Sequence, residues 1–253
     1  MRFTFTVPAP EPLWTPDLLQ EPHAAADKAG RVRRMFNAIA PRYELVNAVF
    51  SGGRDAAWRR KAVHLAAVRH DDDVLDVACG TGNFARAFAE AQPQSVTGCD
   101  FAHEMLRRAG SGGADVRWCE ADALRLPFAA ATFSLVSCAF GVRNFQDLDR
   151  GLAEMFRVLR PGGRAVILEF TRPENPLIRG VYELYTRHIM PVGARLLSGD
   201  HSGAYRYLPK SVVTFLDSAQ FSRRLLSAGF AACATTQLTL GAVTVYVARR
   251  EDR

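Results

Sequence analysis

Long apolar runs are missing from this sequence. No stretch reaches the roughly 18 apolar residues that a membrane-spanning helix needs, and the first residues lack the hydrophobic region of a secretion signal. The chain has only 5 cysteines, and none forms a C-x-x-C pair. Because most of them fall in apolar, strand-like runs, we interpret them as buried thiols in a reducing compartment rather than as disulfides or zinc ligands. We therefore expect a cytoplasmic protein without a metal site. Peripheral contact with the inner face of a membrane is an alternative that these features leave open.

Acidic residues are fewer than basic ones. The formal net charge is +6, with a sequence pI of about 9.3, which favours contact with anions but does not choose between nucleic acid and anionic lipid. With 253 residues that are 48% hydrophobic, the chain can form one sizeable α/β domain. Residues 1–25 contain five prolines, so we expect a loose, flexible arm there and a single domain over 26–253.

Strand-like apolar runs alternate with helical patterns in the middle of the chain, as in a parallel, doubly wound sheet. The predicted strands lie at 73–77, 95–100, 116–120, 133–139 and 164–170, with helices at 83–90, 102–109 and 147–160. Pro161-Gly-Gly163 is expected to form the turn between the last helix and the last strand, because proline ends the helix and glycine permits positive φ.

Further elements are expected on both sides of this core. Three helices precede it, from Asp27 to Pro41, at 43–50 and at 55–68. An insertion over about 174–210 contains the amphipathic stretch Pro176–Leu197 and is expected to cover a ligand cleft as a lid. A helix at 219–228 and an antiparallel hairpin formed by 231–239 and 242–248 complete the predicted α/β fold, a mostly parallel sheet with helices on both faces.

The most informative segment is Val74-Leu-Asp-Val-Ala-Cys-Gly-Thr-Gly82, an apolar run that ends in a glycine turn. Gly80 and Gly82 have no Cβ, so the chain can turn sharply and a ligand can approach the main chain. On its own this signal is weak, because Gly80-Thr-Gly82-Asn-Phe-Ala85 also satisfies the fingerprint of a dinucleotide-binding loop.

Two acids follow the next two predicted strands. Asp100 ends the second strand roughly 20 residues after the glycines, where a carboxylate can hydrogen-bond a ribose. Asp122 ends the third strand in the same way. Each acid has an alternative interpretation as a helix or turn cap, and this alternative has more weight for Asp122.

Several motifs from about Val32 to the C-terminus carry a family resemblance. They are Met35-Phe-Asn-Ala-Ile-Ala-Pro-Arg-Tyr43-Glu-Leu-Val-Asn47, Ser51-Gly-Gly-Arg-Asp-Ala-Ala-Trp58-Arg59, Asp76-Val-Ala-Cys-Gly-Thr-Gly82, Leu126-Pro-Phe128, Phe140-Gly-Val-Arg143-Asn144, Glu169-Phe-Thr-Arg-Pro173 and Tyr205-Arg-Tyr207-Leu-Pro. Together with the antiparallel ending, which departs from NAD-binding sheets, they resemble the ubiquinone/menaquinone biosynthesis C-methyltransferases. The resemblance implies the Rossmann-like fold of class I methyltransferases, with S-adenosyl-L-methionine as cofactor.

The implied reaction is methyl transfer to a ring carbon of a prenylated quinol, either demethylmenaquinol or the benzoquinol of ubiquinone biosynthesis. In such enzymes the acid after the second strand holds the ribose, the acid after the third lies by the adenine, and the glycine loop runs under the methionine portion. The implied cofactor-binding residues are Tyr43, Asp76, Gly80, Thr81, Gly82, Asp100, Asp122, Ala123 and Ala139. Phe101 after the ribose acid favours the menaquinone branch.

The implied catalytic residues are Arg143, Asn144 and Tyr205. Arginine stays charged, so we expect Arg143 to stabilise a phenolate rather than to abstract a proton; a helix-capping or acid-paired surface arginine is the alternative. Tyr205, like Tyr207, is expected either to orient the ring or to pack in the core. His188 as a proton carrier and Glu169 as a hydroxyl acceptor compete with purely structural roles.

Some positions depart from the family pattern and put cofactor contacts or substrate choice in doubt. They are Glu44, Asp55, Ala56, Asn83, Ala139 and Lys210. Because Thr81, Asp100 and Arg143 are present, we still expect an active enzyme.

The expected partners are a prenylated quinol lipid, a membrane surface and a second copy of the chain. Apolar lid residues are expected to receive the isoprenoid tail, and a basic face to rest on anionic lipid: Arg31, Arg33, Arg34, Arg59, Arg60 and Lys61. An ordinary solvated face is the alternative. A nucleic-acid methyltransferase is disfavoured, because the fourth strand lacks the Asn/Asp-Pro-Pro-aromatic motif. A non-catalytic subunit of a quinone-synthesis assembly remains a competing hypothesis.

Overall fold

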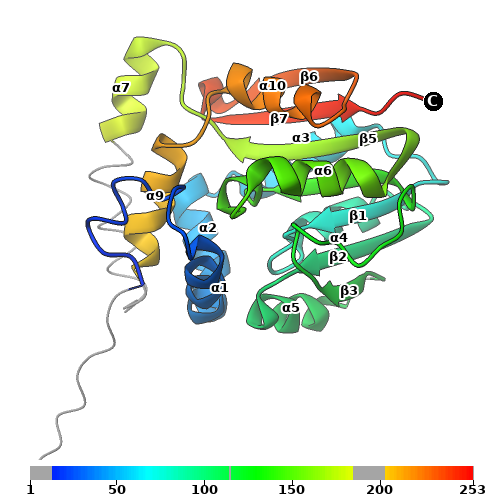
Figure 1. The fold of residues 1–253 in the computed structure, drawn as a ribbon, viewed down its shortest axis with the longest axis horizontal. Coiled ribbons are helices and arrows are strands. Elements are labelled where there is room, and N and C mark those ends of the chain that lie inside the picture. Colours follow the sequence, from blue (N-terminus) through cyan, green and yellow to red (C-terminus); the bar gives the residue numbers. More distant parts are fainter. Residues whose placement is uncertain (1–12, 114, 185–202, 253) are drawn as a thin grey trace, which may run out of the picture.

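A seven-stranded sheet runs through the molecule in the order β3-β2-β1-β4-β5-β7-β6 (Figure 1). This computed structural model describes residues 13–113, 115–184 and 203–252. The strands are β1 (Asp73–Val77), β2 (Ser95–Asp100), β3 (Arg117–Glu120), β4 (Phe133–Ala139), β5 (Leu159–Phe170), β6 (Ala232–Leu238) and β7 (Val243–Arg249). The first five are parallel, whereas β7 is antiparallel to both β5 and β6. The predicted fold class is therefore confirmed.

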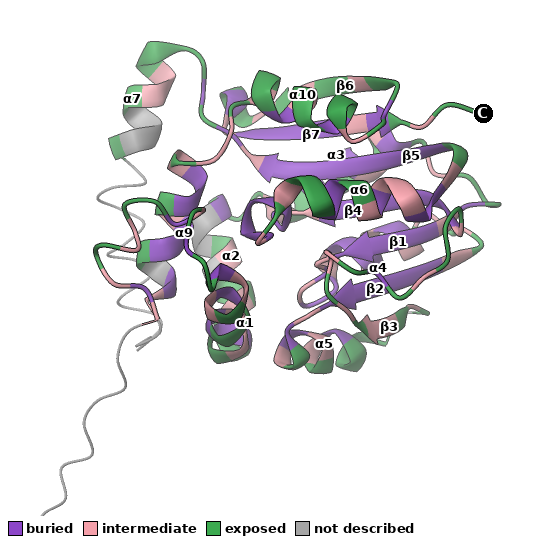
Figure 2. Cartoon of the chain, viewed as in Figure 1, coloured by how far each residue is buried: buried purple, intermediate pink, exposed green. Residues whose placement is uncertain are grey.

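Helices cover both faces of the sheet because its central strands are apolar on both sides. On one face, α3 (Asp55–Ala66) and α4 (Asn83–Ala89) pack their buried residues on the strands. On the other, α6 (Leu148–Val158) and α10 (Ser218–Ser227) do the same. The central strands are accordingly buried while the outer sides of these helices stay exposed (Figure 2).

The link from α6 to β5 differs from the expected turn. Phe133 pairs with Leu159 and Leu135 with Arg164, so the segment that contains Pro161-Gly-Gly163 forms a bulge within β5. Gly162, at φ +71°, occupies the left-handed conformation that this bulge requires, and its N–H donates to the Glu251 carbonyl at 3.0 Å. The sequence correctly indicated that the helix ends close to Pro161. It did not predict that β5 begins before this proline, at Leu159.

A third group of elements covers one end of the sheet. It consists of α1 (Lys28–Ile39), the short helices Ala40–Arg42 and α2 (Tyr43–Ser51), α5 (His103–Ala109) and α9 (Ala204–Val213). Residues 13–25 form turns without a helix or strand, yet Trp14 is fully buried and its ring stacks on Tyr207 at 4.1 Å between centroids. This part of the expected loose arm is thus packed against the domain.

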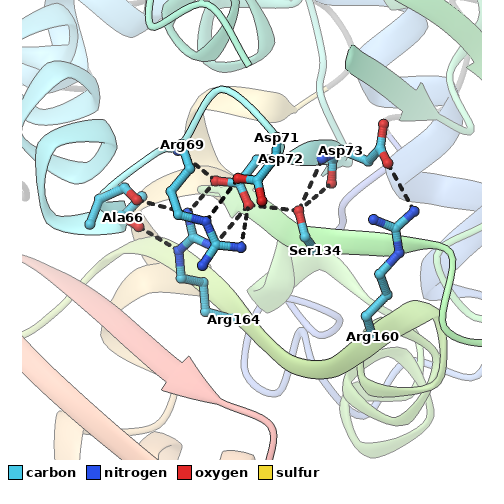
Figure 3. Close-up of polar contacts among 9 residues, drawn as sticks. Ala66, Arg69, Asp71, Asp72, Asp73, Ser134, Arg160 and Arg164 are labelled. Carbon is cyan, nitrogen blue, oxygen red and sulfur yellow. Dashed lines mark hydrogen bonds and ion pairs between the residues drawn. The ribbon is translucent and has the colours of Figure 1, made fainter. Parts of the chain in front are cut away.

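The opposite end of the sheet is held by a buried ionic cluster (Figure 3). Arg164 pairs with Asp72, and its guanidinium also donates to the carbonyls of Ala66 and Ala67 at the end of α3. Burial opposes ionisation of Asp72, but hydrogen bonds from Arg164, the Arg69 backbone and Ser134 keep its pKa below the ordinary value. The cluster ties α3, β1 and β5 together, far from the glycine turn.

The predicted lid lies partly outside the described residues. Its first part forms α7 (Pro176–Leu184), while residues 185–202, which include His188, are not described. Within the described part of the chain, no helix is long and apolar enough to cross a membrane.

Candidate active site

Two adjoining cavities lie at the carboxyl ends of β1, β2 and β4, the edge where open α/β sheets bind ligands. The larger has an empty volume of about 670 Å³ and the smaller one of about 280 Å³. They share Tyr43, Ala78, Gly80 and Ala139. The larger cavity is further lined by Ala29, Phe36, Asp100, Phe101, Met105, Ala121, Asp122, Ala123, Leu124, Phe140, Gly141, Asn144, Phe145 and Gln146. The smaller is further lined by Arg59, Asp76, Cys79, Thr81, Asn83 and Phe84.

The glycine turn is organised by Asp100. Its carboxylate accepts the N–H of Gly80 at 2.8 Å and that of Ala102 at 2.8 Å, so one acid fixes the loops after β1 and β2. Gly80, at φ +57°, faces Tyr43, and a Cβ there would meet the Tyr43 ring at 3.6 Å. Burial raises the pKa of Asp100 to about 6. The main chain at Gly80 therefore borders both cavities without a side chain of its own, next to the Asp100 carboxylate.

Gly82 lies outside both cavities. It sits at φ +84° as the N-cap of α4, and a Cβ would come within 2.4 Å of the Trp118 ring. Its lack of a side chain is thus required by packing against β3 and by the left-handed conformation. The motif correctly identified the turn, but only its first glycine faces the cavities.

Two of the residues that depart from the family pattern, Glu44 and Asn83, contact one another. Glu44 accepts hydrogen bonds from Thr81 Oγ1 at 3.0 Å and from Asn83 Nδ2 at 3.1 Å. Arg86 in turn donates to the Thr81 carbonyl and to Asn83 Oδ1, both at 2.7 Å. Because glutamate is one methylene longer than aspartate and asparagine is a donor, the two changes form a hydrogen bond between α2 and the start of α4.

The cavity wall formed by residues that follow β2 and β3 is mostly apolar. Phe101, Met105, Ala123 and Leu124 line it together with Asp122. Asp122 is exposed, and its carboxylate accepts the Leu124 N–H at 2.9 Å, which closes a local turn. The turn interpretation of Asp122 is therefore correct, and the same residue still lines the larger cavity.

Arg143 does not line either of these cavities. Its guanidinium is buried, pairs with Glu169 Oε1 at 2.6 Å and donates to the Phe140 carbonyl at 2.6 Å. Burial raises the pKa of Glu169 even though the Arg143 charge opposes this. Arg143 is therefore acid-paired, as in the alternative interpretation, but it is buried rather than on the surface, and the Glu169 carboxylate is engaged by the same pair.

Asn144, the neighbour of Arg143, faces the larger cavity. Its Oδ1 accepts the Tyr207 hydroxyl at 3.0 Å, and its Nδ2 donates to the Phe140 carbonyl at 3.3 Å. Tyr207 is fully buried, which raises the pKa of its hydroxyl well above the ordinary value. Tyr205 also lies in α9, but its side chain is outside the described set.

The loop of residues 140–145 is also held from α1. Lys28 is buried, and its Nζ donates to the carbonyls of Arg143 at 3.0 Å and Phe145 at 2.6 Å. Burial and the nearby Arg143 charge lower the pKa of Lys28 to about 8. Sequence reasoning missed this lysine, because one lysine at a helix start resembles any solvated one.

Two buried polar atoms next to the smaller cavity have no hydrogen-bond partner among the described residues. They are Asp76 Oδ2 and Arg59 Nε. Arg59 had been expected on a basic surface, but it is only 6% exposed, so that assignment is wrong. The signal that could have found it is its place beside Trp58 in the family motif, on the side of α3 that faces the sheet.

No group of three or more histidine, cysteine, aspartate or glutamate side chains is placed to hold a metal within 13–113, 115–184 and 203–252. The five cysteines are all free thiols. Burial raises the pKa of Cys79, Cys99 and Cys138 well above the ordinary value, so these are unreactive core thiols.

Comparison with known proteins agrees with this geometry. The model of the ubiE/COQ5 methyltransferase family matches residues 24–250. The chain is 46% identical over 209 residues to a demethylmenaquinone methyltransferase of Deinococcus radiodurans, covering 81% of this chain and 86% of that relative. It is 43% identical over 221 residues to a demethylmenaquinone methyltransferase of Thermus thermophilus, covering 85% and 100%.

Among solved structures, a SAM-dependent methyltransferase from Thermotoga maritima superposes with a TM-score of 0.64 at 18% identity. The match covers 86% of this chain and 99% of that one. At this identity the likeness concerns the fold alone.

Proposed function

Because this chain belongs to the ubiE/COQ5 methyltransferase family, we propose that it methylates a ring carbon of a prenylated quinol, converting demethylmenaquinol to menaquinol. The predicted family and its S-adenosyl-L-methionine dependence are confirmed. The observation that carries the proposal is the edge at which Asp100 orders the glycine turn beside a largely apolar cavity of about 670 Å³. Such a cavity suits one charged cofactor and one apolar ring.

The residues at this edge fit the cofactor. Asp100 presents a carboxylate to the ribose hydroxyls, and Phe101, Met105 and Leu124 form an apolar slot for the adenine. Gly80 leaves main chain accessible below Tyr43. When bound, the sulfonium supplies an electrophilic methyl group.

Chemistry at the ring requires a nucleophilic carbon. A quinol oxygen pushes electron density into the ring, and this increases as its proton leaves. With the methyl donor bound at this site, the ring carbon would take its methyl group as the carbon–sulfur bond breaks and S-adenosylhomocysteine leaves, and the ring proton would pass to solvent, which restores aromaticity. The protein must hold carbon, methyl and sulfur in line.

Asn144 is the polar side chain that we assign to the quinol. It lines the same cavity as Asp100, and the Tyr207 hydroxyl donates to its Oδ1, so its orientation is fixed before a ligand enters. Its amide Nδ2, which makes only a 3.3 Å bond to Phe140, can donate to a ring oxygen. The buried Arg143–Glu169 pair supports this loop from behind, because Arg143 also donates to the Phe140 carbonyl.

The test is turnover. Reduced demethylmenaquinone and the benzoquinol precursor of ubiquinone are each incubated with labelled S-adenosyl-L-methionine, and the extracted lipid is analysed by mass. We expect label on a ring carbon of the naphthoquinol. Binding of the methyl donor without methylation of either quinol would contradict the proposal and favour the non-catalytic subunit.

We also propose a peripheral membrane contact through α7. Leu177 is 80% exposed and Leu184 is 60% exposed, at one end of the molecule (Figures 1 and 2). Exposed leucines on one short helix suit the apolar boundary of a bilayer. Sedimentation with anionic vesicles should retain the protein, and a Leu177→Ser/Leu184→Ser variant should be retained less; equal retention would contradict the contact.

A further inference from the structure

The two outer edges of the sheet are protected to different degrees. β3 has only 4 residues and carries a charge at each end, Arg117 and Glu120. The Glu120 carboxylate is also bonded by Arg33 and His103. β6 has 7 residues, Ala-Cys-Ala-Thr-Thr-Gln-Leu, without a charge or a proline, and it pairs with β7 in one unbroken register. Short strands, charges, prolines and bulges are the devices that keep an open edge from pairing with another strand, and β6 has none of them.

The far side of β6 has no strand partner within residues 13–113, 115–184 and 203–252. The strand order ends at β6, and β7 is the strand with which it pairs. Ala232, Ala234, Thr235 and Gln237 are exposed along it. Alternate N–H and C=O groups of an edge strand point away from its neighbour, so this side of β6 presents a row of main-chain donors and acceptors.

The helix beside this edge continues the uncharged surface. α10 packs next to β6 and β7 (Figure 1), and a hydrogen bond of 3.8 Å from the Cys233 thiol to Ser222 Oγ places this side of the helix along β6. Ala219 and Leu226 share the side of α10 that carries Ser222, because they lie three and four residues away. Both are exposed, Leu226 by 45%. Arg224 points the other way, toward α6, where it is ion-paired. The row that borders the edge therefore carries no charge.

We propose that β6 joins two copies of this chain, paired antiparallel about a two-fold axis that runs perpendicular to the sheet through Thr235. Side chains directly opposite each other in an antiparallel pair point to the same face, so this symmetry requires one residue to meet its own copy. Thr235 is the middle residue of β6, and centring on it uses the whole strand. Ala232 then lies opposite Leu238 of the second copy. Ala234 lies opposite Thr236.

The composition of β6 suits its own copy as the occupant. Each pair on either side of the centre joins a smaller side chain to a larger one, and no like charges face each other. The two central threonines form a cross-strand pair of the kind that stabilises sheets. The contact is also closed, because the joined sheet ends on both sides in β3, the protected edge. It leaves the carboxyl ends of β1, β2 and β4 open, so it does not depend on the proposed function.

The first test is the oligomeric state. Sedimentation velocity from about 1 to 100 μM should show a dimer of the wild-type chain. Thr235→Lys places two like charges opposite each other and should raise the dissociation constant of the dimer by about 30-fold or more. Thr235→Gln is the matched control, since it adds length without charge, and should remain dimeric. Circular dichroism and thermal unfolding check that both variants fold, which we expect because Thr235 is exposed.

The second test is the register, measured by disulfide trapping in a Cys233→Ser background. Thr235→Cys should give a covalent dimer under mild oxidation, because residues directly opposite each other bring their Cβ atoms to about 4.5–5.5 Å. Thr236→Cys is the matched control. Its own copy lies diagonally across the pair, beyond the roughly 7 Å between Cα atoms that a disulfide spans, so it should remain a single chain on a non-reducing gel.

A monomer at every concentration would overturn the proposal, because the edge would then be left to water or covered within the chain. A dimer with the same dissociation constant in Thr235→Lys would overturn it too, since the contact would lie on another surface. Should Thr235→Lys fail to fold, the cross-links decide: trapping by Thr235→Cys alone supports the pairing, and equal or absent trapping in both variants contradicts it. These measurements need neither methyl donor nor quinol, so their outcome is separate from that of the proposed function.

Discussion

The two sides of the active site are built differently. The floor consists of the loops after β1, β2 and β4, residues 78–82, 100–102 and 139–144. The cover consists of residues 13–39 and α9. In the floor, the Asp100 carboxylate accepts hydrogen bonds from backbone N–H groups of two neighbouring loops, and the strands behind these loops are paired with one another. The cover is held by side chains far apart in sequence, such as Trp14 on Tyr207.

This difference indicates a division of labour. The floor loops after β1 and β2 carry groups we assign to the cofactor, and the cover contacts the loop after β4 that we assign to the quinol. Lys28 and Tyr207 from the cover contact residues 143–145 after β4 directly. Damage to the cover should therefore affect the quinol step more than cofactor binding, and damage to the loops after β1 and β2 should do the reverse.

The largest effect is expected where floor and cover meet. Arg143→Met leaves Glu169 buried without its partner, so the free energy of unfolding should fall by about 3–5 kcal/mol in urea denaturation. Turnover should fall by about 100-fold or more, with cofactor affinity changed far less. The double variant Arg143→Met/Glu169→Gln should regain at least half of the lost stability. A single variant that loses under about 1 kcal/mol would show that the pair is not needed.

The cover alone is tested by Trp14→Ala. Removing this fully buried ring should cost about 3 kcal/mol of unfolding free energy and lower quinol turnover, because Tyr207 loses its stacking partner. Affinity for S-adenosylhomocysteine should stay within about threefold. Trp14→Phe is the conservative control and should recover most turnover. A loss of cofactor affinity as large as the loss of turnover would contradict the division between cover and floor.

The floor alone is tested by Asp100→Ala. Both the assigned ribose contact and the two backbone hydrogen bonds disappear, so cofactor affinity should fall by about 100-fold in calorimetry. The matched control is Asp71→Ala, at an exposed aspartate in the loop before β1, which should bind normally. Unchanged affinity in Asp100→Ala would remove the ribose assignment.

A smaller effect, of opposite sign, is expected from Asp76→Asn. The pKa of Asp76 is raised from 3.8 to about 7, so the folded protein binds a proton that the unfolded chain has already released between those pH values. Stability from this group is therefore full below pH 3.8 and is lost as pH rises to about 7.

The Asp76→Asn variant does not lose stability in this way, because asparagine does not ionise. Its unfolding free energy without ligand should match wild type near pH 4 and exceed it by on the order of 2 kcal/mol at pH 8, while it binds the cofactor less well. Thermal or urea unfolding of both proteins across this range measures the difference. Comparing two proteins cancels the contributions of other titrating groups, such as Lys28 and His23. A difference independent of pH would contradict the assigned pKa.

Much of the floor was predictable from sequence. The apolar runs gave β1, β2 and β4 at their observed bounds, and the motif before Gly82 predicted the turn that Asp100 orders. These signals are local, because strand pattern and turn chemistry depend on a few adjacent residues. The prediction of a turn at Pro161-Gly-Gly163 was wrong, because proline and glycine mark the end of a helix whether a turn or a bulge follows.

The cover was largely unpredictable. A proline-rich start favoured a loose arm, although Trp14 is buried against α9. Arg59 was assigned to a basic surface, and Arg143 to the cavity rather than to Glu169. The pairing of each charge depends on residues far along the chain, and no local pattern records these.

The sequence by itself determined the alternation of strands and helices, the position of the glycine turn and the acids that follow the strands, because each depends on short-range periodicity and backbone chemistry. Only the tertiary structure decided which charges are neutralised and which remain available. It pairs Arg143 with Glu169 and leaves Arg59 and Asp76 each with an unsatisfied atom beside one cavity. The physical reason is that the cost of a buried charge depends on the partners that folding brings within hydrogen-bond reach.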